Sequence, residues 1–149
     1  MEIKPILLVE DSPDDETLTL RTLQKHKIPC DVTVAHDGVE ALDYLFATGP
    51  CAGRPRLTPH LILLDLKLPK VDGLEVLRQV RSNPLTRSLP IVVFTSSNEA
   101  HDIAESYNLG ANSYIRKPVD YHRFSEAIRL IGTYWLSENL PPHAGINFG

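Results

Sequence analysis

The sequence predicts a single α/β domain built on a doubly wound parallel sheet. Short apolar runs alternate five times with longer segments of helical period, which is typical of repeated βαβ units. Three of these runs are apolar almost throughout, as expected for strands that helices cover on both faces. A chain of 149 residues has room for one domain of this kind.

The predicted strands differ in composition. The first, third and fourth are nearly continuous aliphatic runs, whereas the second and fifth are shorter or more mixed, so we expect these two at the edges of the sheet. In chain order the predicted strands are Ile6–Glu10, Asp31–Ala35, Leu61–Leu66, Ile91–Thr95 and Ser113–Arg116.

The segments between the strands have apolar residues at the spacing of amphipathic helices. The clearest is the last, where Phe124, Ile128 and Trp135 belong to one apolar stripe. Asp120 precedes this helix, where a carboxylate favours the positive end of the helix dipole, and Gly110 has the position of a helix-ending residue.

Two stretches interrupt the alternation. Residues 48–59 contain three prolines and two glycines, so we expect a long connection there between the second helix and the third strand. Residues 137–149 lack periodicity and contain two consecutive prolines, so we expect an irregular tail.

The composition excludes several classes of protein. With 42% hydrophobic and 23% charged residues, and no apolar run near the ~18 residues of a membrane span, we expect a globular protein that does not enter a membrane. The net charge of −4 gives no electrostatic drive towards nucleic acid. The N-terminus lacks a secretory pattern, so we expect a cytoplasmic protein in which Cys30 and Cys51 are free thiols.

Polar residues gather where the predicted strands end. Glu10 and Asp11 lie at the end of the first strand and Asp65 near the end of the third. Thr95 closes the fourth strand, and Lys117 follows the fifth. Because the carboxyl ends of parallel strands share one edge of the sheet, where open α/β folds bind ligands, we expect these side chains to converge.

Three carboxylates in one pocket repel each other unless their pKa values rise or a cation joins them. Mg²⁺ fits best, because it prefers oxygen ligands and combines carboxylates with phosphate oxygens. Carboxylates with Mg²⁺, a lysine and a hydroxyl are the components of phosphoryl transfer. Asp65 is the predicted nucleophile, since a carboxylate can form an acyl phosphate.

Most of these residues also have a plainer interpretation. Glu10 and Asp11 could begin a turn and cap the following helix, while Thr95 and Lys117 could be an ordinary strand residue and an ordinary surface residue. Asp65 is harder to explain in this way, because a charge within the apolar run LILLDL requires a partner. The chain has no glycine-rich nucleotide-binding motif.

Four motifs together resemble a two-component response-regulator receiver domain: the acidic pair Glu10-Asp11, LLDLKLPKVDG around Asp65, FTSS at Thr95 and YIRKP at Lys117. The resemblance covers residues 3–135. It implies a CheY-like fold with strand order 2-1-3-4-5. We accordingly expect a receiver domain over residues 1–136 and a C-terminal extension over 137–149.

The resemblance also implies a role for each residue. Asp65 is the implied phosphoryl acceptor. Thr95 would form a hydrogen bond with the phosphoryl group, and Lys117 would form an ion pair with it. Thr95 and Tyr114 are the implied switch residues, although the Tyr114 ring could also simply pack on the last helix. The implied Mg²⁺ ligands are Asp11, Asp65, the backbone carbonyl of Lys67 and, through water, Glu10.

More narrowly, the Pro- and Gly-rich connection and the ending GTYWLSENLPP are similar to the stand-alone regulators of cyanobacterial phytochromes. This similarity implies a phytochrome-like sensor histidine kinase as phosphodonor and a tendency to form a homodimer. Tyr134, Trp135 and Leu136 are exposed apolar candidates for a dimer or kinase contact.

We therefore predict a stand-alone response regulator that catalyses only its own phosphorylation and dephosphorylation. It would signal by protein contact, without a DNA-binding output domain. The alternative is a phosphorylation-independent interaction module, which the complete set of site residues disfavours. A dehalogenase-like hydrolase would need a second aspartate, but Lys67 stands two residues after Asp65.

Overall fold

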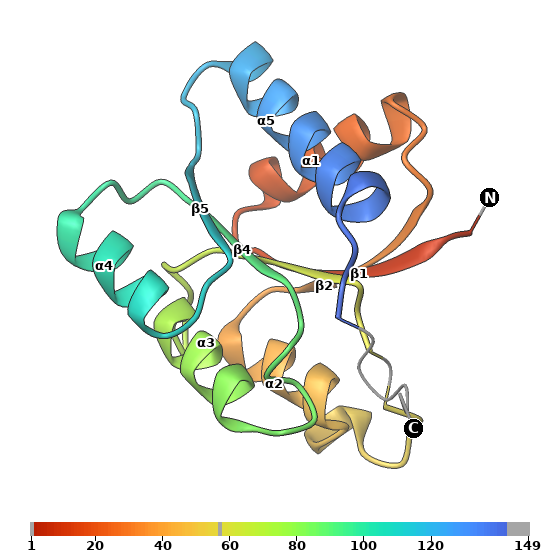
Figure 1. The fold of residues 1–149 in the computed structure, drawn as a ribbon, viewed down its shortest axis with the longest axis vertical. Coiled ribbons are helices and arrows are strands. Elements are labelled where there is room, and N and C mark those ends of the chain that lie inside the picture. Colours follow the sequence, from red (N-terminus) through yellow and green to blue (C-terminus); the bar gives the residue numbers. More distant parts are fainter. Residues whose placement is uncertain (1, 57, 143–149) are drawn as a thin grey trace.

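The computed structural model describes residues 2–56 and 58–142 and has five parallel strands in one sheet (Figure 1). Their order is β2-β1-β3-β4-β5, so the predicted fold class is confirmed and the second and fifth strands lie at the edges. The strands are β1 (Lys4–Val9), β2 (Cys30–Ala35), β3 (Leu61–Leu64), β4 (Ile91–Thr95) and β5 (Ser113–Arg116).

Helices connect the strands, and several begin at a capping side chain. Ser12, Asp37, Asp72 and Asp120 each accept a hydrogen bond from a backbone N–H of the first turn that follows. Gly110 has a φ of +103°, which suits the helix-ending position predicted for it. The helices are α1 (Pro13–Lys25), α2 (Gly38–Phe46), α3 (Gly73–Ser82), α4 (Ala100–Asn108) and α5 (Tyr121–Thr133).

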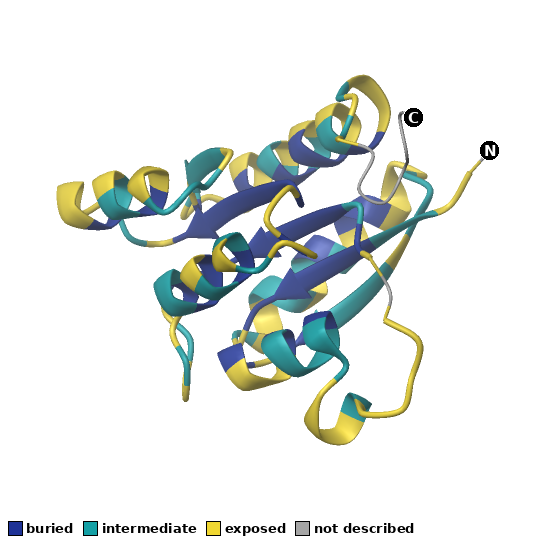
Figure 2. Ribbon diagram, turned by 60° about the horizontal axis from the view of Figure 1, so that its bottom comes forward, coloured by how far each residue is buried: buried dark blue, intermediate teal, exposed yellow. Residues whose placement is uncertain are grey.

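The sheet is the central layer, with α1 and α5 on one face and α2 and α3 on the other (Figure 1). Alternate residues of β1 point to opposite faces: Leu7 and Val9 join the cluster beneath α2 and α3, whereas Ile6 and Leu8 join the cluster beneath α1 and α5. β3 and β4 are buried along their whole length, as the dark blue central strands of Figure 2 show, which explains their apolar sequence.

Two strand ends differ from the prediction. β1 ends at Val9 and β3 ends at Leu64, so Glu10 and Asp65 lie just beyond the strands and not within them. Their backbone N–H groups still bond to the sheet, to the carbonyls of Ala35 and Val9 at 2.9 and 3.1 Å. The strands therefore fix the backbone positions of both carboxylates at the carboxyl edge of the sheet.

The long connection after α2 contains a short 3₁₀ helix, Gly49–Cys51. After its last residue, Thr133, α5 continues as a π-helical turn, Tyr134–Glu138. Residues 143–149 of the predicted tail lie outside the described part of the chain. Among the described residues, none of the helices has the length and hydrophobicity needed to cross a bilayer.

The predicted exposure of the apolar residues after α5 is only partly correct. Tyr134 is half exposed, but Trp135 packs against the core and Leu136 is buried within it. The Lys4 ammonium also donates a hydrogen bond to the Leu136 carbonyl. The π-helical turn rotates Leu136 inward, so the prediction that it is exposed is wrong.

Candidate functional site

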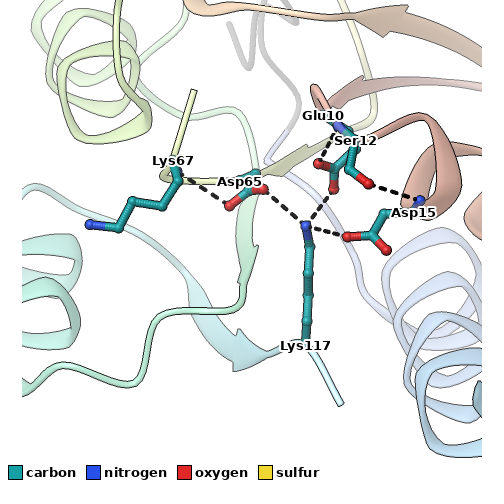
Figure 3. Close-up of polar contacts among 6 residues, drawn as sticks. All are labelled: Glu10, Ser12, Asp15, Asp65, Lys67 and Lys117. Carbon is teal, nitrogen blue, oxygen red and sulfur yellow. Dashed lines mark hydrogen bonds and ion pairs between the residues drawn. The ribbon is translucent and has the colours of Figure 1, made fainter. Parts of the chain in front are cut away.

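The ends of β1, β3, β4 and β5 bring the predicted site residues to one edge of the sheet. Figure 3 shows the carboxylates of Glu10 and Asp65 on either side of the Lys117 ammonium. The backbone N–H of Lys117 donates to the Thr95 carbonyl at 2.7 Å, so the end of β4 fixes the backbone position of Lys117. The convergence expected from the parallel topology is therefore present.

The Lys117 ammonium is the centre of a buried ion cluster. It lies 2.7 Å from Oε1 of Glu10, 2.9 Å from Oδ2 of Asp65 and 2.9 Å from Oδ2 of Asp15. Lys117, Glu10 and Asp65 are each at most 6% exposed. An ammonium has three protons to donate, and here it donates hydrogen bonds to Asp15 and Asp65 and forms an ion pair with Glu10.

Asp15 is a site residue that sequence reasoning did not identify. It lies in the first turn of α1, where the helix dipole alone is enough to explain an acidic residue. Its contact with Lys117 joins residues 102 positions apart, and no local sequence signal reports such a contact.

Glu10, Asp11 and Asp65 form a cluster that can hold a cation. Each offers a carboxylate oxygen, and these oxygens lie within 4.8 Å of one another. Burial raises the pKa of Glu10 to about 7, with a further contribution from the nearby charge of Asp65, although Lys117 opposes the shift. Asp11 is exposed, so the cluster is open to solvent on that side. Only oxygen donors are present, which suits a hard divalent ion such as Mg²⁺.

Backbone contacts fix the orientation of the Asp65 carboxylate. The backbone N–H of Lys67 donates to Oδ1 of Asp65 at 3.3 Å, so Oδ1 and Oδ2 have different partners. α3 begins directly against this segment: a Cβ on Gly73 would lie 2.3 Å from the Asp65 carbonyl oxygen. Only glycine at position 73 lets the helix approach so closely.

Thr95 is fully buried, and its hydroxyl oxygen has no hydrogen-bond partner in the structure. Buried hydroxyls are normally satisfied, so an unpaired one at a strand end indicates a place where a ligand oxygen can bind. Beside it, a pocket of about 390 Å³ is lined by Ser96, Lys117, Pro118 and Tyr121, among other residues, and gives access to the Lys117 side of the site.

A second polar network lies between Lys67 and α4. The Lys67 ammonium is 3.3 Å from Oδ2 of Asp102, which also accepts a hydrogen bond of 2.6 Å from Ser97. These contacts lower the pKa of Asp102, mainly through the Ser97 bond, and raise that of Lys67. The Tyr114 hydroxyl donates to the Ser97 carbonyl at 2.8 Å. Its neighbour Ile115, and not Tyr114, belongs to the cluster with α5.

The fold and this constellation define a receiver domain. The family model described as the response regulator receiver domain matches residues 6–129, and the chain belongs to this family. It is therefore a phosphorelay receiver, related over almost its whole length to response regulators of phytochromes.

Three known proteins show how close this relation is. Response regulator Rcp1 from Synechocystis sp. is 38% identical over 95% of this chain and 95% of its own, and the crystal structure of its Mn²⁺-bound form has a TM-score of 0.87. The phosphorylated cyanobacterial phytochrome response regulator RcpA is 39% identical, with a TM-score of 0.88 over 95% of this chain and 99% of that chain. The bacteriophytochrome response regulator RtBRR is 50% identical, with a TM-score of 0.75 over 96% of this chain and 86% of that chain.

Proposed function

We propose that Asp65 is the residue that accepts the phosphoryl group. The observation that carries this proposal is the position of its carboxylate, which belongs both to the three-carboxylate cluster and to the Lys117 ion cluster. Of the acidic residues in the described part of the chain, Glu10 shares both clusters, but it lies deeper, at 3% exposure against 6%, and burial raises the pKa of its carboxylate to about 7.

In the proposed reaction, the phosphorus–nitrogen bond of a kinase phosphohistidine breaks as a bond forms between phosphorus and an Asp65 oxygen. The leaving imidazole nitrogen takes a proton from solvent. Lys117 pairs with the phosphoryl oxygens, and the unpaired Thr95 hydroxyl supplies a hydrogen bond that the unphosphorylated site does not use. Beyond adding and removing this group, we propose no catalytic activity.

We further propose that the cation is Mg²⁺, held by Glu10, Asp11, Asp65 and the Lys67 backbone carbonyl. The oxygen-only donor set and the presence of Mn²⁺ in the structure of Rcp1 support this proposal. When bound, the ion would neutralise charge on the phosphoryl oxygens during transfer.

Phosphorylation of Asp65 would be transmitted as a change in the conformation of the loop between β4 and α4. A Thr95–phosphoryl bond favours a conformation in which this loop approaches Asp65, and Tyr114 is tied to the same loop through the Ser97 carbonyl. We therefore keep Thr95 and Tyr114 as the proposed switch residues.

We also propose a phytochrome-like histidine kinase as donor, a homodimer as the assembly and the cytoplasm as the location. The relationship to RcpA, Rcp1 and RtBRR supports the donor. Leu130 and Tyr134, each at least half exposed, support an apolar contact. The free thiols of Cys30 and Cys51 are compatible with a reducing compartment.

Phosphorylation by a small donor tests the central proposal. Purified protein is incubated with acetyl phosphate and Mg²⁺, and the gain of one acid-stable, base-labile phosphoryl group is followed by intact mass. Asp65→Asn should gain none, whereas the control Asp31→Asn, an exposed aspartate of β2, should behave like wild type. Equal gain by Asp65→Asn would contradict the assignment, and no gain by wild type would favour the interaction module.

Two further measurements test the partners. Phosphoryl transfer to this protein should be faster from a phytochrome kinase than from an unrelated histidine kinase. Light scattering after size exclusion should give the mass of a dimer, and the variant Tyr134→Glu should shift it towards the monomer. A monomer under all conditions would contradict the proposed assembly.

A further inference from the structure

The side chain of Lys67 points away from the site to which its backbone belongs. Its backbone N–H donates to Asp65, but Figure 3 shows the ammonium extended to the side opposite Lys117. There it pairs with Asp102 at 3.3 Å. The Lys67 side chain is 64% exposed, so solvent surrounds it and no packing locks its flexible stem in place.

Asp102 is held much more firmly than its partner. Its side chain is 7% exposed, lies in the first turn of α4 and accepts the Ser97 hydroxyl at 2.6 Å. Among the ion pairs of the described residues, the one with Lys67 is the only one that Asp102 forms. A buried, hydrogen-bonded carboxylate therefore holds an exposed ammonium.

Phosphorylation would place a second strong anion beside the backbone segment from which the Lys67 side chain extends. A phosphoryl group adds a charge of about −1.5 to −2 and three acceptor oxygens. The Lys117 ammonium is already directed at three carboxylates. Lys67, whose backbone N–H bonds to Asp65 itself, has one ion-pair partner among the described residues, Asp102, and an exposed side chain.

We propose that Asp102 and the phosphoryl group on Asp65 compete for the Lys67 ammonium. In the unphosphorylated protein Asp102 is a positioning residue, which keeps this charge outside the phosphoryl site. After phosphorylation Lys67 becomes an additional ligand of the phosphoryl oxygens. The inference rests on the proposed role of Asp65.

This exchange would also connect the site to α4. Losing Lys67 leaves Asp102 as a buried carboxylate without its cation, held only by Ser97. Ser97 carries the carbonyl that Tyr114 binds. Phosphorylation would therefore remove the ion pair that stabilises the first turn of α4. At the same time, the bond from Thr95 to the phosphoryl group would bring the preceding loop closer to Asp65.

Beryllofluoride, which forms a phosphoryl-like adduct on carboxylates, tests the competition at equilibrium. Its affinity in the presence of Mg²⁺ is measured by ¹⁹F NMR for wild type, Asp102→Asn, Lys67→Met and the double variant. Asparagine keeps an oxygen that can accept the Ser97 hydroxyl but lacks the charge that holds Lys67. We expect Asp102→Asn to bind about two- to fivefold more tightly and Lys67→Met more weakly by a similar factor, the range of an exposed ion pair.

The double variant decides between this proposal and a simple charge effect. If Asp102 acts through Lys67, the double variant binds like Lys67→Met alone. An equal gain from Asp102→Asn in both backgrounds would overturn the proposal, because the gain would then be a long-range effect of removing a negative charge. An unchanged affinity of Lys67→Met would also overturn it.

The same measurement separates this proposal from the proposed function. No adduct on wild type, or an adduct retained by Asp65→Asn, means that the proposed phosphoryl site itself is wrong. An adduct that is lost in Asp65→Asn but is indifferent to Lys67→Met removes only the role of Lys67. Lys67 is on the surface, so its variant is expected to fold even where Asp102→Asn is impaired.

Discussion

Replacing Lys117 by methionine should lower the stability of the protein by an amount that depends on metal and pH. The substitution keeps an unbranched side chain of similar length but removes the ammonium that lies between Glu10, Asp65 and Asp15. Glu10 and Asp65, which are almost completely buried, would then face each other without a protein cation.

The size of the effect follows from the distances. At about 2.9 Å and an effective dielectric constant of about 20, one such pair has a Coulomb energy of about 6 kcal/mol before desolvation. Much of this only offsets the cost of burying the ammonium, so removing it should lower the free energy of unfolding by about 3–5 kcal/mol. The loss should be largest above the Glu10 pKa of about 7, where this carboxylate is ionised in wild type.

Urea unfolding followed by circular dichroism measures this loss above and below the Glu10 pKa, with and without Mg²⁺. The loss should shrink at the lower pH, because the carboxylates can then protonate, and Mg²⁺ should restore part of the stability. The control Lys67→Met removes an exposed ammonium with one partner and should cost at most about 1 kcal/mol. A loss for Lys117→Met no larger than for the control, or one that is independent of pH, would refute the reasoning.

Three other predictions concern single residues. Because its pKa is raised from 4.5 to about 7, Glu10 contributes stability to the metal-free protein that is complete below pH 4.5 and lost as the pH rises through about 7, and Glu10→Gln should flatten this dependence in unfolding titrations. Gly73→Ala should cost about 1–3 kcal/mol in thermal unfolding and slow acetyl phosphate labelling, since the new Cβ would displace the Asp65 backbone; an unchanged rate would contradict this. Arg81 donates to the carbonyls of Gly110, Arg87 and Leu89, so Arg81→Ala should cost about 2–3 kcal/mol in urea unfolding and Arg81→Lys should recover only part; full recovery would show that charge alone matters.

Much of the fold was predictable because its signals are local. Unbroken apolar runs indicate strands covered on both faces. The shorter or more mixed runs indicated the two edge strands, β2 and β5. The convergence of Glu10, Asp65 and Lys117 also followed from sequence, since parallel strands place all their carboxyl ends on one edge.

The features that sequence could not predict depend on contacts between distant elements. Asp15 has the sequence context of an ordinary helix-start residue, and only the folded position of α1 relative to the residue that follows β5 gives it a partner in Lys117. Leu136 follows two aromatic residues at a helix end and was expected to be exposed, but a π-helical turn rotates it into the core. The Asp102 network likewise depends on where α4 begins relative to Lys67.

The most direct test of the central claim is to identify the phosphorylated residue chemically. Reduction of the acyl phosphate with borohydride converts a phosphorylated aspartate to homoserine, which peptide mass spectrometry locates in the sequence. We predict homoserine at position 65, in a yield that depends on Mg²⁺ and falls in Lys117→Met. Homoserine at position 11 or 15 instead, or none at all after labelling, would contradict the account.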